Sequence, residues 1–320
     1  MSQRRGSMTL RVEGLGKRYK NGTWGLRGFS MWPQPGVLAI IGPAGAGKST
    51  LLRMLATVTP PTEGTISWEG IDVGPRPARY RRVLGYLPQH LGTYEGVSGR
   101  AFMRYIAALK GLPRRSAVAR VDELLDILDL SAFADRKMGG YPHTIRWRVG
   151  LAQALLNDPP LLLVDEAGSS LDEDERGAFY ALVGELSQGR TTIVATDRAA
   201  DVARIAARVG LLSQGRLVRL DAAEGGGALA YHTVDDLIHS MCGRVWSVTV
   251  DQNTLVELRR TCLFSDVARE DGLVRLRILA AARPHPQAVA VEPTLADACA
   301  YHIHRDGTSR VSGHTVPEGA

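Results

Sequence analysis

The most constraining feature of this sequence is a glycine-rich loop placed between an apolar run and a helical pattern. Residues 37–41, Val-Leu-Ala-Ile-Ile, are wholly apolar and predict a buried β-strand. The loop follows at once and fits G-x-x-x-x-G-K-[ST], and Leu51, Leu52 and Leu55 then recur at helical spacing. The loop residues are Gly42, Pro43, Ala44, Gly45, Ala46, Gly47, Lys48, Ser49 and Thr50. This order predicts an α/β fold with a phosphate-binding loop.

The residue types in this loop suit the phosphate groups of a nucleotide. Glycines allow backbone N–H groups to turn inward around phosphate oxygens, and the N-terminus of the following helix adds a favourable dipole. Lys48 would reach the β- and γ-phosphates, and the Ser49 hydroxyl would coordinate Mg²⁺. We therefore expect this loop to hold a nucleotide together with a magnesium ion.

A second expected strand ends in two carboxylates. Residues 161–164 are apolar, and Asp165 and Glu166 follow them directly. A carboxylate at the end of a buried strand can coordinate Mg²⁺, and the adjacent glutamate can polarise an attacking water. An Asp-Glu pair after a strand is common by itself, but its combination with the phosphate loop favours a nucleotide site with hydrolytic chemistry.

The first two-thirds of the chain alternate short β-rich runs with helical patterns, which predicts an α/β domain with a largely parallel sheet. Further strands are expected at 192–195, buried, and at 65–70, exposed. Ser98 is expected to cap one helix, and a second helix is expected over 121–130. The buried side of that second helix is expected to comprise Leu124, Leu125, Ile127 and Leu128.

The pattern changes after Glu224, where Gly-Gly-Gly-Ala indicates a linker. Alternating residues at 245–250 and 273–278 then predict strands of a small α+β domain. We expect a first domain over residues 1–224 and a smaller accessory domain over 225–320, with a disordered tail after about Asp306. The second domain carries no recognisable chemistry.

Charge and cysteine content limit the function classes. The net charge of +6 divides into +8 up to Glu224 and −2 beyond it, and 34 of the 39 basic residues are arginine. No basic stripe is interleaved with aromatic residues, so nucleic acid is not expected as a partner. The densest basic cluster, expected to be a solvated face, comprises Arg76, Arg79, Arg81 and Arg82. Three scattered cysteines, no transmembrane run and no secretory signal predict a soluble protein of a reducing compartment.

Several motifs together resemble those of the ATP-binding subunit of an ABC transporter. Besides the phosphate loop, they are Tyr86-Leu-Pro-Gln89, Val149-Gly-Leu-Ala-Gln-Ala-Leu155, and Leu161-Leu-Leu-Val-Asp-Glu166 followed by Ser170-Leu-Asp172. Val291-Glu-Pro-Thr-Leu-Ala-Asp297 also resembles the C-terminal extension of the subgroup paired with multidrug or ABC-2-type permeases. The resemblance covers roughly residues 9–220, in the expected order.

This resemblance implies a fold and a set of partners. The fold would be a P-loop NTPase (RecA-like) core with an antiparallel β subdomain and a helical subdomain over about 97–156. Such subunits work as head-to-tail dimers that sandwich two ATP molecules. The implied ligands are ATP and Mg²⁺, and the implied partners are a transmembrane permease subunit and a second ATP-binding subunit, identical or different. The expected location is cytoplasmic, peripheral on the inner face of the plasma membrane.

The resemblance also implies roles for individual residues. Tyr19 matches the aromatic residue that stacks on adenine, and a core or surface tyrosine is the alternative. Gln89 matches the glutamine that contacts Mg²⁺ and water and senses the membrane partner. Asp165 matches the Mg²⁺ carboxylate, and Glu166 matches the catalytic base. Residues 170–172 match the loop that couples the two sites across the dimer.

The signature segment departs from the family pattern. Tyr141-Pro-His-Thr-Ile145 stands where the family usually has Leu-Ser-Gly-Gly-Gln, whose hydroxyl and N–H groups reach the γ-phosphate bound by the opposite subunit. Pro142 offers neither a hydroxyl nor an N–H, and the side chains of His143 and Thr144 obstruct close backbone approach. In the alternative, His143 or Thr144 donates a side-chain hydrogen bond to that phosphate.

A second departure follows the strand expected at 192–195. Asp197 stands where the family usually has a histidine that contacts the γ-phosphate. An imidazole can donate a hydrogen bond to that phosphate, whereas an ionised carboxylate repels it, and losing one such donor costs about 10²–10³ in rate. Locally, Asp197 is expected to cap a helix that begins near Arg198.

These residues favour an ATP-hydrolysing transport subunit with reduced turnover, because the phosphate loop, Gln89, Asp165 and Glu166 are all retained. The alternative is a nucleotide-binding regulatory subunit with little or no hydrolysis, which acts through ATP-dependent dimerisation. An unrelated P-loop kinase or a DNA-associated ATPase does not explain Gln89 together with residues 170–172.

Overall fold

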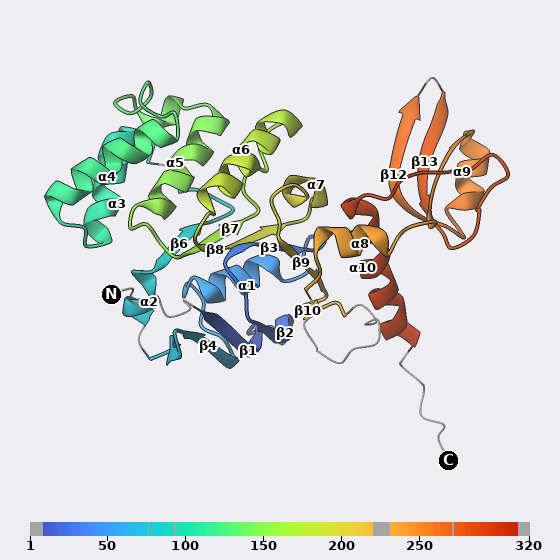
Figure 1. Cartoon of the computed structure of the whole chain (residues 1–320), viewed down its shortest axis with the longest axis horizontal. Coiled ribbons are helices and arrows are strands. Elements are labelled where there is room, and N and C mark those ends of the chain that lie inside the picture. Colours follow the sequence, from blue (N-terminus) through green and yellow to red (C-terminus); the bar gives the residue numbers. More distant parts are fainter. Residues whose placement is uncertain (1–8, 76, 93, 220–230, 271, 313–320) are drawn as a thin grey trace, which may run out of the picture.

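The computed structural model describes residues 9–75, 77–92, 94–219, 231–270 and 272–312. These residues form three β-sheets with helices packed around them (Figure 1). A six-stranded, largely parallel sheet forms the centre of the larger lobe, and a four-stranded antiparallel sheet lies on the other side of helix α1. A second four-stranded antiparallel sheet belongs to the C-terminal part of the chain.

The central sheet has the strand order β10-β9-β3-β8-β7-β6. Its strands are β3 (Gly36–Ile41), β6 (Leu84–Leu87), β7 (Leu161–Asp165), β8 (Thr191–Thr196), β9 (Arg208–Ser213) and β10 (Arg216–Leu217). All neighbours are parallel except β9 and β10. Along β3, Val37, Ala39 and Ile41 pack into one apolar cluster, while Leu38 and Ile40 pack into another, because both faces of the sheet are covered. The predicted α/β class and its buried strands are confirmed.

The antiparallel sheet of the larger lobe has the order β2-β1-β4-β5. Its strands are β1 (Leu10–Arg18), β2 (Trp24–Met31), β4 (Glu63–Trp68) and β5 (Ile71–Asp72). The strand expected at 65–70 does form as β4, but only one of its faces is exposed. Ile66 and Trp68 are 5% and 7% exposed, because alternate residues of this strand face the apolar cluster around α1.

Helices flank the central sheet and also form a separate region. Those at the sheet are α1 (Lys48–Leu55), α2 (Pro77–Arg81), α6 (Glu173–Leu186) and α7 (Ala199–Val202). The helical region comprises α3 (Gly99–Leu109), α4 (Arg114–Ile127), the 3₁₀-helix η1 (Met138–Gly140) and α5 (His143–Leu155). Among the described residues, no helix combines the length and apolar character that a membrane span requires.

The helical region tests two local predictions. Ser98 caps α3 as expected, since its hydroxyl accepts a hydrogen bond from the Ala101 N–H at 3.3 Å. The helix expected over 121–130 extends instead from Arg114 to Ile127, and Ala117 in its second turn is already buried. The assignment of Ile127 to the buried side is wrong, since its side chain is 46% exposed near the end of α4.

The C-terminal sheet is antiparallel, with the order β12-β13-β11-β14. The elements of this part are α8 (Val234–His239), β11 (Val245–Val250), α9 (Gln252–Leu258), β12 (Leu263–Glu270), β13 (Leu273–Leu279), β14 (Val289–Ala290) and α10 (Leu295–Ser312). The strands predicted at 245–250 and 273–278 are confirmed. Inward-facing Val248, Leu276 and Ile278 form the centre of a separate small core.

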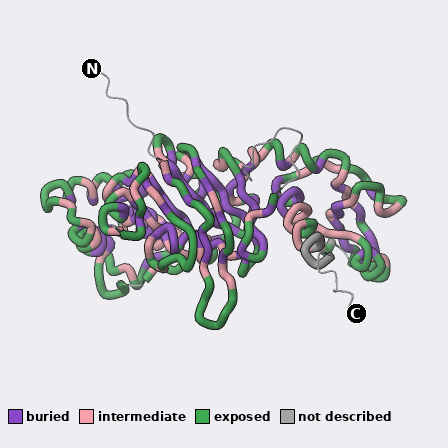
Figure 2. The backbone as a smooth tube through the Cα atoms, turned by 90° about the horizontal axis from the view of Figure 1, so that it is seen from below, coloured by how far each residue is buried: buried purple, intermediate pink, exposed green. Residues whose placement is uncertain are grey.

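Two C-terminal helices are part of the larger lobe's packing. Helix α10 contacts α7, α8 and β9, and Leu237, Leu295 and Ala298 belong to the same apolar cluster as the central sheet. Figure 2 shows buried backbone continuing from the strands of the larger lobe into this junction. The linker expected at Glu224 lies outside the described residues. The tail expected to be disordered after Asp306 is helical to Ser312, because α10 continues beyond its packed first half.

Candidate nucleotide-binding site

The glycine-rich loop connects the carboxyl end of β3 to α1, as its sequence predicts. Gly45 and Gly47 have φ angles of 78° and 104°, a left-handed region that a side chain disfavours. A Cβ on Gly47 would lie 2.2 Å from the Gly25 carbonyl oxygen, and one on Gly42 would lie 2.2 Å from the Leu212 carbonyl oxygen. The cradle therefore depends on glycine for both conformation and close packing.

Lys48 is held inside this cradle. The side chain is almost fully buried, and its Nζ donates to the carbonyl oxygens of Gly42 at 2.6 Å and Pro43 at 2.9 Å. The same Nζ lies 2.9 Å from Oε1 of Glu166. A buried ammonium surrounded by oxygens at the start of α1 occupies the position from which it can bind a phosphate group.

Ser49, which follows Lys48, meets Asp165, which precedes Glu166. The Ser49 hydroxyl donates to Oδ1 of Asp165 at 2.9 Å, and the Tyr86 hydroxyl donates to Oδ2 at 3.3 Å. Burial raises the pKa of Asp165, and the neighbouring charge of Glu166 adds to this effect, although both hydrogen bonds oppose it. A hydroxyl and a carboxylate at this spacing are hard oxygen donors, which fit the coordination preference of Mg²⁺.

Glu166 lies at the turn after β7. It has a φ angle of 43°, an uncommon value for a residue with a side chain, and its N–H donates to the Ala195 carbonyl at 2.9 Å. This turn directs the carboxylate toward the phosphate loop, where Oε1 pairs with Lys48 and Oε2 accepts from Nε2 of Gln89 at 2.7 Å. The structure thus brings together Gln89, Lys48 and Glu166 from three separate elements.

Tyr19 lies between β1 and β2, beside the first turn of α1. Its hydroxyl is 3.0 Å from the Thr50 hydroxyl, and the ring packs over Gly25, where a Cβ would approach Tyr19 Cε2 to 2.6 Å. The side chain is 40% exposed, so one part of the ring remains open to a ligand. The position suits an aromatic platform at the edge of the phosphate loop.

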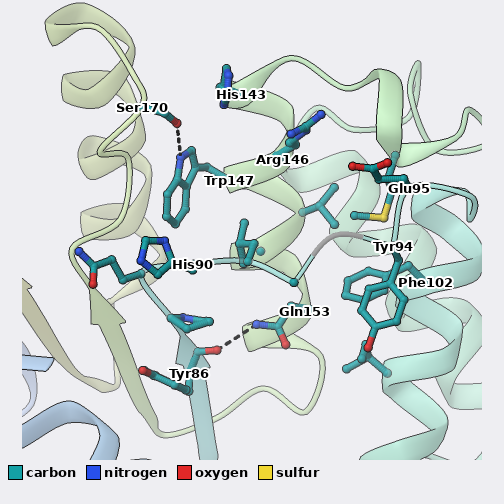
Figure 3. Close-up of a pocket in the computed structure, with 18 of the residues that line it drawn as sticks. Tyr86, His90, Tyr94, Glu95, Phe102, His143, Arg146, Trp147, Gln153 and Ser170 are labelled. Atoms are coloured by element: carbon teal, nitrogen blue, oxygen red, sulfur yellow. Dashed lines mark hydrogen bonds between the residues drawn. The ribbon is translucent and has the colours of Figure 1, made fainter. Parts of the chain in front are cut away.

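A cavity of about 530 Å³ adjoins Gln89, between its loop and the helical region (Figure 3). The indole Nε1 of Trp147 donates to the Ser170 hydroxyl at 3.2 Å, and Gln153 Nε2 donates to the Tyr86 carbonyl at 2.9 Å. These bonds connect α5 to the loop after β7 and to β6. Sequence reasoning missed the contacts of Tyr86 and Trp147, although both residues stand inside or next to quoted motifs.

The departing signature segment lies at the start of α5, where His143 lines this cavity and Pro142 does not. Pro142 precedes α5 as its N-cap residue, and no side chain caps the helix. Pro142 and His143 are exposed, whereas Tyr141 is buried, with its hydroxyl donating to the Phe133 carbonyl. The proline therefore stands at the exposed start of α5, with no contact to Lys48 or Glu166.

Asp197 follows β8 at the same sheet edge as the phosphate loop, since the Gly42 N–H donates to the neighbouring Thr196 carbonyl at 3.3 Å. Its side chain is exposed. The expectation that it caps the next helix is wrong. Arg198 is the N-cap residue of α7, and no side chain caps this helix. The Thr196 hydroxyl accepts from the Arg198 N–H at 3.0 Å and donates to Asp201 at 3.2 Å. Threonine can make both bonds because its hydroxyl is donor and acceptor at once.

Comparisons with known proteins identify the family of this chain. The ABC transporter family profile matches residues 29–169. The daunorubicin resistance ATP-binding protein DrrA2 of Streptomyces coeruleorubidus is 32% identical over 218 residues, which cover 68% of this chain and 67% of the relative. The ABC transporter ATP-binding protein YxlF of Bacillus subtilis is 33% identical, over 56% of this chain and 59% of its own length. The chain thus spans less than two thirds of that relative.

Among solved structures, an ATP-binding subunit of an ABC transporter superposes with a TM-score of 0.61 at 25% identity, covering 72% of this chain and 92% of that one. The region matched by sequence contains the phosphate loop, the turn at Glu166 and the whole helical region. The sequence similarity to these relatives shows that the chain belongs to the ATP-binding subunits of ABC transporters.

Proposed function

We propose that this chain binds ATP with Mg²⁺ and hydrolyses it to ADP and phosphate, and so energises a separate membrane permease. The observation that carries the proposal is the network that joins Lys48, Glu166 and Gln89 at the phosphate loop. It combines a phosphate-binding cation, a carboxylate that can accept a proton and an amide that can orient water.

Each residue of the site would have a distinct role. Lys48 and the N–H groups of the loop would bind the phosphates, and Ser49 and Asp165 would hold Mg²⁺, which neutralises phosphate charge when bound. Glu166 would accept the proton of the water that attacks the γ-phosphorus, while Gln89 orients that water. The side chain of Tyr19 would stack on the adenine ring at the rim of the site.

The arrangement of Glu166 suggests how a nucleotide prepares the base. Its two oxygens are occupied, one by Lys48 and the other by Gln89. A phosphate group that binds Lys48 would compete with the Glu166 carboxylate for the same ammonium. The phosphate and the carboxylate would also repel each other, because both are negatively charged and both would lie beside Lys48. Glu166 would then be released toward the attacking water. Nucleotide binding thereby converts a structural carboxylate into a proton acceptor.

We propose reduced turnover because of the two departures at the phosphate-facing positions. An exposed carboxylate at Asp197 lies at the edge of the site, where an ionised group disfavours the charge that develops on the γ-phosphate. Pro142 removes an N–H donor from the start of α5, which would weaken the site of the opposite subunit. The retained base Glu166 favours slow hydrolysis over a purely regulatory role.

The proposed partners are a transmembrane permease and a second ATP-binding subunit, identical or different, at the cytoplasmic face of the membrane. The cavity beside Gln89 supports the first, since it is lined by apolar and aromatic side chains such as Leu91, Phe102 and Ile106. Such a lining suits an inserted helix of another chain. A change in the position of that helix would reach Glu166 through Gln89.

The test is an ATPase assay of the purified chain, alone and co-purified with a permease encoded beside it. We expect ATP·Mg²⁺ binding, slow hydrolysis of the isolated chain and faster hydrolysis in the complex. The Lys48→Ala variant should lower ATP affinity, measured by titration with a fluorescent ATP analogue. Absence of ATP binding by the unsubstituted chain would overturn the proposal, and undetectable hydrolysis in the complex would favour the regulatory alternative.

A further inference from the structure

A cavity of about 440 Å³ lies in the C-terminal part, where the end of α9, the start of β12 and helix α10 meet. Three arginines line it, Arg259, Arg260 and Arg305, together with His304. Within the described part of the chain, no aspartate or glutamate is among its lining residues. We call this the C-terminal basic cavity, and it shares no lining residue with the cavity beside Gln89.

The positive charge at this cavity is local. Residues 225–320 contain nine basic and eleven acidic residues, so this part of the chain has a net charge of −2. A fourth arginine stands behind the cavity wall, because Arg244 donates from Nη1 to the Tyr301 hydroxyl at 3.1 Å and lies 5.8 Å from the centre of that ring. Four of the nine arginines of an otherwise acidic region therefore gather at one place.

Arg259 and Arg260 are fixed by their backbone but not by their side chains. Their N–H groups continue the helical bonding of α9, to Leu255 at 3.0 Å and Glu257 at 3.1 Å. Among the described residues, neither guanidinium forms an ion pair or a hydrogen bond, not even to the carbonyls at the end of α9. Helix capping is thus not their role, and two adjacent like charges without counter-charge favour an anion.

The remaining lining suits a phosphate group attached to a carbon skeleton. Guanidinium groups bind phosphate oxygens through two parallel hydrogen bonds. The Tyr301 hydroxyl accepts from Arg244, which leaves its own proton available for donation. Leu263 and Leu279 provide an apolar floor, and the volume lies in the range of roughly 300–1,000 Å³ that is usual for small-molecule sites.

We propose that the C-terminal basic cavity binds a phosphate-bearing anion, with Arg259 and Arg260 as its principal contacts. The phosphate group belongs either to a soluble metabolite or to the headgroup of an anionic lipid, and the same chemistry recognises both. This site is separate from the phosphate loop and does not depend on the proposed ATP hydrolysis. It gives the accessory part of the chain a ligand of its own.

The test uses the full chain with inorganic pyrophosphate as the probe, measured by isothermal titration calorimetry. A Lys48→Ala background removes binding at the phosphate loop, and the unsubstituted chain saturated with ADP and Mg²⁺ serves as an independent second background. Replacing Arg259 and Arg260 with alanine should weaken pyrophosphate binding by about tenfold or more. The matched control replaces Arg114 and Arg115, an exposed adjacent pair at the start of α4, and should leave binding unchanged.

A second arm distinguishes the source of the phosphate. Co-sedimentation with phosphatidylcholine vesicles, with and without phosphatidylglycerol, assigns a lipid headgroup if binding requires phosphatidylglycerol, Arg259 and Arg260, and if pyrophosphate competes. Pyrophosphate binding without vesicle binding assigns a soluble ligand. Equal binding of pyrophosphate by both arginine-pair variants, or equal loss in both, overturns the proposal, because net charge alone would then explain the result. Unchanged ATP affinity of the variant at Arg259 and Arg260 confirms that the chain is folded.

Discussion

Lys48 and Glu166 form an ion pair in which Nζ lies 2.9 Å from Oε1. The lysine is 3% exposed, and the carboxylate is only partly accessible, so solvent screens the pair weakly. One residue belongs to the phosphate loop and the other to the turn after β7. The pair therefore holds Lys48, which is expected to bind phosphate, against Glu166, which is expected to accept a proton, in the absence of a nucleotide.

The first prediction concerns Glu166→Gln. The amide keeps the size of the side chain but cannot accept the proton of the attacking water, so the hydrolysis rate should fall by about 10²–10⁴. ATP affinity should stay equal or rise, because Lys48 loses a competing anion. Single-turnover hydrolysis and nucleotide titration measure the two effects separately. Glu173→Gln, an exposed acid at the start of α6, is the matched control, and an equal loss in both variants would refute the role.

The second prediction concerns Asp197→His. An imidazole at the edge of the phosphate loop can donate to the γ-phosphate, so the ATPase rate should rise by up to about 10²–10³. Asp197→Asn removes the charge without supplying the imidazole and should give a smaller rise. Comparing steady-state phosphate release by the two variants distinguishes the repulsion by the Asp197 carboxylate from the lack of a hydrogen-bond donor to the γ-phosphate. A rate that stays at the level of the unsubstituted chain in both variants would show that Asp197 does not limit turnover.

The third prediction concerns the start of α5. Replacing Pro142 with serine and His143 and Thr144 with glycine restores a hydroxyl and open N–H groups at an exposed position. The ATPase rate should then rise and depend more steeply on protein concentration, because this segment is proposed to act on the site of a second subunit. Glycines in the first turn should cost about 0.5–1 kcal/mol each in stability. Sedimentation in the presence of ATP reports dimer formation; an unaltered rate despite intact dimers would contradict the interpretation.

The fourth prediction concerns the pH dependence of stability at Lys110. Burial lowers the pKa of this lysine to about 8, and its Nζ donates to Oδ1 of Asn157 at 2.8 Å. The unfolded chain then binds more protons than the folded chain between about pH 8 and pH 10.5, so stability at this site rises with pH in that window. In the unsubstituted chain, the free energy of unfolding should rise by roughly 3 kcal/mol across that range, and Lys110→Met should abolish this rise. Urea unfolding at several pH values measures it. Lys20→Met, which removes an exposed lysine, is the control. If Lys20→Met changed the pH dependence of stability as much as Lys110→Met does, burial of Lys110 would not be the cause.

The fifth prediction concerns Asp297, which is 1% exposed. Burial raises its pKa, but the Arg277 guanidinium at 2.7 Å and hydroxyls of Ser265 and Thr294 outweigh that effect, and the net pKa lies below the ordinary value. The stability from this site is therefore present above the unfolded pKa and is lost as pH falls through the lower folded pKa. Asp297→Ala should lower the free energy of unfolding by about 3–5 kcal/mol, because the half-buried guanidinium of Arg277 then loses the carboxylate that it pairs with. Thermal unfolding measures the loss; a change below 1 kcal/mol, small beside the usual cost of breaking a buried pair, would contradict it.

Local patterns predicted the elements that carry the site. The apolar runs at 37–41 and 161–164 are strands because both faces of the central sheet are covered, and the glycine spacing of the loop sets its backbone directly. Patterns failed where apolar residues do not mark an element. The exposed arginines at the start of α4 and the helical continuation of α10 after Asp306 gave no such signal.

The contacts between distant side chains required the tertiary structure. Only the packing of β6 beside β7 places Tyr86 against Asp165, and only the approach of α5 to the loop after β7 places Trp147 against Ser170. The Asp197 cap failed for a related reason, since the backbone places Arg198, and not Asp197, at the N-cap position of α7. Capping propensities identify the residue types that can cap a helix. The backbone path after β8 decides which residue stands at the capping position.

The sequence by itself determined the class of fold, the phosphate loop and the identity of the residues that flank it, because glycine conformation and strand periodicity act over a few residues. The tertiary structure alone decided that Lys48 and Glu166 pair and that Gln89 reaches the same carboxylate. It also gathered Arg259, Arg260 and Arg305 around one cavity. Such relationships depend on how separate elements pack, and packing is settled by long-range burial that no local pattern encodes.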